Sequence, residues 1–62
     1  MFKENDTVYL KKERFISAVV ISTDYNRAGS PQVQVEYQKP NGAIGIVTKW
    51  VNVEDISKRK GE

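Results

Sequence analysis

The segment Gln32–Gln38 alternates strictly between polar and apolar side chains. Its apolar members are Val33, Val35 and Tyr37, and Gln or Glu occupies every position between and beside them. Strict period-two alternation is typical of a β-strand with one buried face. No window of about ten residues elsewhere shows the i, i+3, i+4, i+7 spacing of an amphipathic helix. The chain is therefore predicted to be all-β.

Further strands are predicted where β-branched and apolar residues gather between turn signals, at Thr7–Lys11, Phe15–Thr23 and Ala43–Trp50. Pro40-Asn41-Gly42 has the composition of a hairpin turn. Val51–Ile56 is predicted to form a 3₁₀ turn that leads to a last short strand or an apolar plug. The period-two positions predict a core that comprises Val8, Leu10, Val33, Val35, Ile44 and Ile46.

With 62 residues the chain has room for one domain. Several short strands with turns between them suit a small antiparallel barrel, because a closed barrel has no exposed strand edges. We expect this barrel to span residues 1–57. Residues 58–62 contain three consecutive cations, Lys58-Arg59-Lys60, and no apolar side chain, so they are expected to form a flexible basic tail.

Composition argues against catalysis and against metal binding. The chain has no His and no Cys, which excludes the usual Ser-His and Cys-His nucleophiles, thiolate metal sites and disulfides. The acidic residues are scattered, and the glycines are isolated and form no phosphate-binding loop. We expect no enzyme activity, no cofactor and no metal.

No apolar run approaches the roughly 20 residues needed to cross a bilayer, and the N-terminus lacks the apolar stretch of a signal peptide. A cytoplasmic protein without membrane contact is therefore expected. Ten Lys and Arg against eight Asp and Glu give a net charge of +2, which is too small to indicate nucleic-acid binding by itself. The cations are, however, grouped near Lys11–Arg14 and in the C-terminal tail.

Basic and aromatic residues together form the candidate binding set. Cations contact the phosphates of a nucleic acid, while aromatic rings stack on its bases. Tyr9 has the opposite parity to its apolar neighbours and is predicted to be exposed, whereas Tyr37 shares the parity of the core. Trp50 shares the parity of Ile44 and Ile46, which favours the core over a surface platform beside Tyr9. The full candidate set is Tyr9, Lys11, Lys12, Arg14, Tyr25, Arg27, Lys49, Trp50, Lys58, Arg59 and Lys60.

The order of these features resembles a family pattern. Asp6-Thr7-Val8-Tyr9-Leu10 is similar to the first strand of SH3-like, Tudor and KOW barrels, with Asn5 and Ser17 at positions where those barrels usually have glycine. The closing segment Trp50–Ile56 is similar to theirs, and the likeness covers about residues 5–57. The resemblance implies an SH3-like barrel of about five short strands with a 3₁₀ turn near the C-terminus.

Two hypotheses describe the function. The first is a non-enzymatic module that binds nucleic acid or a nucleic-acid-associated complex. The second is a small protein-interaction or inhibitor domain, which includes self-association to a homo-oligomer. So short a barrel also resembles the small accessory proteins of phages and mobile elements.

Overall fold

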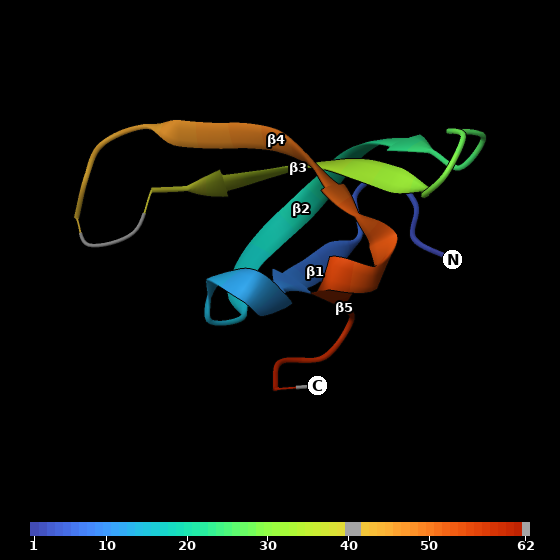
Figure 1. Ribbon diagram of the computed structural model, residues 1–62. Coiled ribbons are helices and arrows are strands. Elements are labelled where there is room, and N and C mark those ends of the chain that lie inside the picture. The colour runs from blue at the N-terminus through green and yellow to red at the C-terminus, as the bar shows by residue number, and fades with distance from the viewer. Residues whose placement is uncertain (40–41, 62) are drawn as a thin grey trace.

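The computed structural model describes residues 1–39 and 42–61 (Figure 1). It contains one sheet of 5 antiparallel strands in the order β4-β3-β2-β1-β5, and no α-helix occurs within the described residues. Two 3₁₀ turns, η1 and η2, precede β2 and β5. In chain order the elements are β1 (Thr7–Leu10), η1 (Lys11–Glu13), β2 (Ile16–Asp24), β3 (Gln32–Gln38), β4 (Ile46–Asn52), η2 (Val53–Asp55) and β5 (Ile56–Ser57). The all-β prediction is confirmed.

The long strand β2 connects the two halves of the sheet. Its first residues, from Ile16 to Val19, pair with β1, and its later residues, from Val19 to Asp24, pair with β3. The register shifts between Val20 and Ser22, which is the mark of a β-bulge. Because a bulge bends its strand and increases the local twist, β1 and β5 lie below β2 while β3 and β4 lie above it (Figure 1).

The core lies between these two halves. It draws residues from four strands, and no helix covers it in the described part of the chain. The buried set is Val8, Leu10, Ala18, Val20, Val33, Val35 and Ile56. The prediction is thus confirmed for both β1 residues and both β3 residues. Tyr37 is half-buried and packs against this core.

The core prediction is wrong for Ile44 and Ile46, which are 96% and 61% exposed. Ile46 pairs with Gln38 and therefore shares the polar face of β3. Trp50 is placed in the same way opposite Gln34 and is 45% exposed, so the core assignment is wrong for it too. Apolar residues occupy both parities of this strand, and a shift of one residue exchanges its two faces.

Other strand boundaries depend on the backbone. The observed β3 has the predicted bounds, whereas β2 begins one residue later than predicted. Arg14 and Phe15 both have a φ of 56°, which is incompatible with extended structure. β4 begins only at Ile46, because Gly45 has a φ of 134° and ends the preceding loop. Of the predicted turn, Pro40 and Asn41 lie outside the described residues.

The sheet is open. β4 and β5 stand at its two ends, and within the described ranges they do not pair with each other. This differs from the predicted closed barrel. The two-residue strand β5 pairs only with β1, so it leaves β4 as a free edge. In residues 1–39 and 42–61, no helix is long and apolar enough to span a membrane.

Candidate functional site

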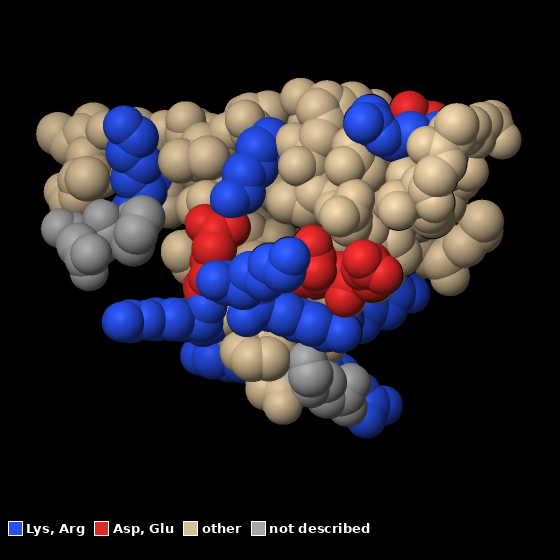
Figure 2. Space-filling view, viewed as in Figure 1, with Lys and Arg blue, Asp and Glu red and all other residues tan. Residues whose placement is uncertain are grey.

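Two groups of basic residues that are far apart in the sequence lie on the same side of the molecule. Pairing of β1 with β5 sets Tyr9 opposite Ser57 and Leu10 opposite Ile56. Since η1 comes directly after β1 and residues 58–61 come directly after β5, both groups extend from this one strand pair. Lys and Arg gather over the lower part of the molecule in Figure 2, where Figure 1 shows η1, β1 and the C-terminal segment. We call this surface the basic face, and it comprises Lys11, Lys12, Arg14, Lys58, Arg59 and Lys60.

Within the basic face, the first two lysines contact the second 3₁₀ turn. Lys11 Nζ donates a hydrogen bond to the backbone oxygen of Glu54 at 3.4 Å. Lys12 Nζ lies 3.5 Å from a carboxylate oxygen of Asp55, yet 77% of the Lys12 side chain stays exposed. An ion pair this exposed contributes little to stability. The Lys12 ammonium therefore remains accessible to another anion.

The residue after η1 presents a further cation. Arg14 is exposed and adopts the left-handed conformation, and Phe15 does the same before β2 begins. The Phe15 N–H donates to the Leu10 oxygen at 2.9 Å and so closes the turn. The left-handed region costs an ordinary L-residue roughly 1 to 2 kcal/mol. The hydrogen bond from Phe15 to Leu10 thus offsets the cost of two left-handed residues in the tight connection from β1 to β2. Arg14 lies in this connection and is exposed to solvent.

The C-terminal cations begin in a defined turn. Ser57 is buried, its hydroxyl donates to the Arg59 oxygen at 2.7 Å, and it accepts from the Arg59 N–H at 3.0 Å. Lys58 Nζ lies 5.7 Å from the centre of the Phe2 ring, which is within range of a cation–π interaction. Lys60 is exposed. These contacts orient the segment along the basic face.

Lys49 is the member of the candidate set that forms an ion pair across the sheet. It lies on the inner face of β4, and its Nζ donates to one oxygen of Glu13 in η1. The Tyr37 hydroxyl donates to the other oxygen at 2.8 Å. The side chains of Lys49 and Glu13 are 39% and 35% exposed. We call these three residues the Glu13 cluster. The cluster connects η1 to β3 and β4, although no strand pairing joins η1 to either strand.

The Glu13 cluster changes the ionisation of all its members. The hydrogen bond from Lys49 holds the pKa of the Glu13 carboxyl below its ordinary value of 4.5, against the opposing effect of burial. The same bond raises the pKa of Lys49. Burial, together with the hydrogen bond to Glu13, raises the pKa of the Tyr37 hydroxyl. The cluster is therefore held in its charged Glu13, charged Lys49 and neutral Tyr37 form at neutral pH.

The remaining candidates do not join the basic face. The Tyr25 hydroxyl accepts from the Phe2 N–H at 2.7 Å and donates to the Phe2 oxygen at 2.9 Å, so it anchors the N-terminal segment. Arg27 is exposed in the β2–β3 loop, which Figure 1 shows at the opposite end of the molecule from η1. Trp50 lies on the outer face of β4. Tyr9 is half-buried on that same outer face, at the β1 position opposite Ser57.

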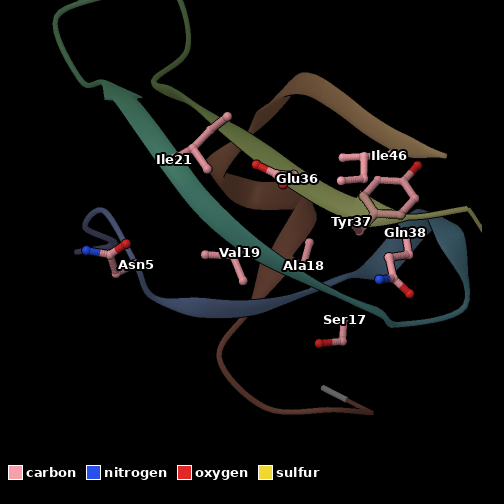
Figure 3. A pocket seen from close by; sticks show the side chains of 9 residues that line it. All are labelled: Asn5, Ser17, Ala18, Val19, Ile21, Glu36, Tyr37, Gln38 and Ile46. Carbon is pink, nitrogen blue, oxygen red and sulfur yellow. The ribbon is translucent and has the colours of Figure 1, made fainter.

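A shallow hollow lies on the outer face of the sheet (Figure 3). The side chains of Val19 and Ile21 from β2 and of Ile46 from β4 give it apolar walls, and Glu36 contributes a carboxylate. Hydroxyl and amide groups complete the lining. Such a lining offers apolar and hydrogen-bonding contacts. In the described part of the chain, no three acidic side chains lie close enough together to hold a metal ion.

Sequence reasoning missed the residues that order the site. Glu13 carries no local signal, because its two partners lie 24 and 36 residues further along the chain. Ser57 is the predicted end of the domain, and its contact with Arg59 is a serine turn that the sequence Ser-x-Arg does not specify. The positive φ of Asn5, 74°, could have been predicted, since Asn adopts the left-handed region more readily than most residues.

We compared the chain with protein-family models, curated proteins and solved structures, and none of them matches.

Proposed function

We propose that this chain is a non-enzymatic binding module whose basic face binds the phosphate backbone of nucleic acid. The observation that carries the proposal is the pairing of β1 with β5, which sets η1 and the C-terminal cations on one side of the molecule. The basic residues lie in two sequence segments separated by most of the chain. Their common surface is thus a product of the fold, and a positively charged surface is suited to bind a nucleic-acid backbone.

Each part of the basic face has a role in this proposal. Lys12 and Arg14 are exposed cations at one end, and Lys60 is exposed at the other. The carboxylate of Asp55 is a weak partner for the exposed Lys12, so a phosphate can take its place. Tyr9 is not a member of the basic face, but it lies in β1, directly before Leu10 and η1, and its ring is the aromatic group that we propose to stack on a base.

The same arrangement supports an SH3-like fold as part of the proposal. The resemblance implies about five short antiparallel strands and a 3₁₀ turn near the C-terminus, and the sheet of β4-β3-β2-β1-β5 with η2 before β5 agrees with both features. Asn5 adds a further point of agreement. It has a positive φ of 74° at a position where such barrels usually have glycine, and glycine is the residue that adopts positive φ most readily.

A protein-interaction role is the second candidate. It is favoured by the exposed apolar side chains of the outer face, where Ile46 is 61% and Trp50 is 45% exposed. Exposed Trp residues are common anchors of protein interfaces. The upper part of the molecule, over β4, is largely uncharged in Figure 2. Contacts of this kind are apolar and respond weakly to salt, which separates the two candidates experimentally.

The test is the salt dependence of binding to a fluorescent single-stranded oligonucleotide. Each phosphate contact releases counterions, so log K should fall with log salt at a slope of about −0.7 per contact. Three to five contacts from the basic face predict a slope of about −2 to −3.5. The triple change Lys58→Gln, Arg59→Gln and Lys60→Gln should reduce that slope by about 2. Titration by fluorescence anisotropy between about 25 and 300 mM salt measures both slopes.

Two variants control this test. Arg27→Gln removes a cation at the opposite end of the molecule and should leave the slope unchanged. Tyr9→Ala should weaken binding by about 1 to 3 kcal/mol without changing the slope, whereas Tyr9→Phe retains the ring and the affinity. Absence of binding to single- or double-stranded DNA or RNA at about 50 mM salt and high micromolar protein would reject the nucleic-acid proposal.

A further inference from the structure

The free edge of β4 presents unpaired backbone groups at known positions. The Lys39 N–H donates to the Gly45 oxygen, and the Val53 N–H donates to the Pro31 oxygen, so these two residue pairs bracket the β3–β4 ladder. The register between them runs without a shift. Hydrogen-bonded and non-hydrogen-bonded pairs alternate along an antiparallel ladder. The odd-numbered residues of β4 therefore bond to β3, and the N–H and C=O groups of Ile46, Thr48 and Trp50 point away from the sheet.

This edge lacks most of the features that usually prevent strands from pairing between molecules. Exposed edges are commonly protected by Pro, by a bulge, or by a charged side chain, including one that points inward, or are kept short. β4 is 7 residues long, contains no Pro, and pairs with β3 without a bulge. The strand has one protecting feature, the inward-pointing side chain of Lys49, but its charge is neutralised by Glu13 within the same chain, which weakens this protection. Within residues 1–39 and 42–61, no strand pairs with the edge of β4 that points away from β3.

We propose that a second copy of this chain pairs with the β4 edge, antiparallel, about a two-fold axis at Thr48. Side chains that meet across a sheet must share a face, and backbone groups that point outward must meet each other. With the axis at Thr48, this residue faces its own copy, and Ile46 faces Trp50 of the second copy on both sides of the axis. The two exposed apolar residues of the strand thus cover each other, which is the self-complementarity that a two-fold interface requires.

Other registers fit the strand less well. An axis at Lys49 sets two lysines directly opposite each other, which is destabilising. An axis at Trp50 leaves Ile46 beyond the paired segment. The Thr48 register avoids both problems, because β4 carries no acidic residue and its only cation is already bonded within its own chain. A second copy can therefore approach without repulsion between like charges.

The neighbouring hollow adds apolar contact to this interface. Ile46 forms part of its wall in Figure 3, so Trp50 of the second copy would lie at its rim. One strand pair with two Ile–Trp contacts is smaller than the roughly 1,600 Å² buried by a standard interface. We therefore expect a weak dimer with a dissociation constant between about 1 µM and 1 mM.

Charge reversal at the two-fold axis tests the proposal. In T48K and in T48E two like charges face each other, and each variant should raise the dissociation constant about five-fold or more. An equimolar mixture of the two should restore association, because the charges are then opposite. T7K and T7E are matched controls, since Thr7 is also exposed but lies in β1, which β2 and β3 separate from β4 in the sheet order, and is outside the proposed interface. Sedimentation equilibrium at concentrations up to about 1 mM gives all these constants.

Amide exchange of the unmodified protein provides a second measurement that needs no variant. The amides of Ile46, Thr48 and Trp50 should become protected as concentration rises, whereas those of Val47 and Lys49 are protected at every concentration. Three results would overturn the proposal: a chain that stays monomeric at about 1 mM, association that T48K and T48E leave unchanged, or association without new protection at Thr48. The last result would indicate contact through the apolar outer face alone.

Discussion

Glu13 joins two parts of the chain that no strand pairing connects. It lies in η1, directly after β1, and accepts hydrogen bonds from Tyr37 of β3 and Lys49 of β4. One carboxylate thereby links the basic face to the upper half of the sheet. It also takes Lys49 out of the set of cations available to a ligand. The Glu13 cluster is partly exposed, so water and salt reduce the strength of its charge interactions.

The Glu13 cluster makes stability depend on pH at both extremes. The pKa of Glu13 is lowered in the folded chain, so its contribution is present above the ordinary value of 4.5 and is lost as pH falls through the lower folded value. The pKa of Tyr37 is raised, so its contribution is present below 10.0 and is lost as pH rises through the higher folded value. Lys49 behaves as Tyr37 does, from an ordinary pKa of 10.5. Stability is expected to be greatest between these limits.

Replacing Glu13 with Gln should lower the free energy of unfolding at pH 7 by about 0.5 to 1 kcal/mol. The loss should shrink as the pH falls from 4.5 through the lowered pKa of the folded-state Glu13 carboxyl, because that carboxyl then becomes protonated as well. Urea unfolding at several pH values measures both effects. Glu4→Gln, an exposed change of the same kind, is the control and should alter neither. Equal losses for the two variants at pH 7 would show that the Glu13 cluster contributes nothing specific.

At the scale of elements, β4 has two faces whose roles the register decides. Val47 and Val51 lie opposite Tyr37 and Val33 on the inner face, where Val51 packs against the core, whereas Ile46 and Trp50 lie on the solvent side. Both faces carry large apolar side chains. The composition of β4 therefore does not predict which of its residues are buried. The strand is also the free edge of the sheet.

Truncation of one residue from each face of the β3–β4 ladder, Val35 on the inner face of β3 and Ile46 on the outer face of β4, tests this register. Val35→Ala removes methyl groups from a fully buried site and should cost about 1 to 3 kcal/mol of unfolding free energy. Ile46→Ala, at a site that is 61% exposed, should cost less than about 0.5 kcal/mol at low micromolar concentration. Denaturant unfolding of both variants provides the comparison. A larger loss for Ile46→Ala than for Val35→Ala would mean that the faces of β4 are reversed.

On the scale of the whole molecule, charge and exposed apolar surface are separated. The basic face lies around η1, β1 and the C-terminal segment, and the surface over β4 is formed mainly by uncharged side chains with scattered charged ones (Figure 2). The bend at β2 produces this separation, because it carries the two halves of the sheet in different directions. Two surfaces of different chemistry in so small a chain are expected to act independently.

This independence is testable with variants of the two surfaces. At protein concentrations below the dimer dissociation constant the protein is monomeric. Under that condition T48K and T48E should leave the salt slope of oligonucleotide binding unchanged. The triple change Lys58→Gln, Arg59→Gln and Lys60→Gln should leave the dimer dissociation constant unchanged within about two-fold. Anisotropy and sedimentation equilibrium on the same samples check both statements. A change of slope in T48E alone would mean that β4 contributes to the basic face.

The sequence by itself determined the class of the fold, the bounds of β3 and the buried face of β1 and β3. In those strands apolar and polar residues alternate along the chain, so only one face can be buried at low cost. It also indicated the 3₁₀ turn and the short strand that come after β4. These features depend on neighbours in the sequence.

Tertiary structure decided the faces of β4, the open sheet, and the membership of the basic face. Apolar residues occupy both parities of β4, so only its register with β3 shows that Ile46 and Trp50 are outside. Lys49 and Tyr25 have the character of surface groups in the sequence, but their partners, Glu13 and Phe2, are far away along the chain. Contacts between distant segments depend on how strands are ordered and bent. Local residue patterns carry no information about that order, which is why the candidate site was predicted less well than the strands.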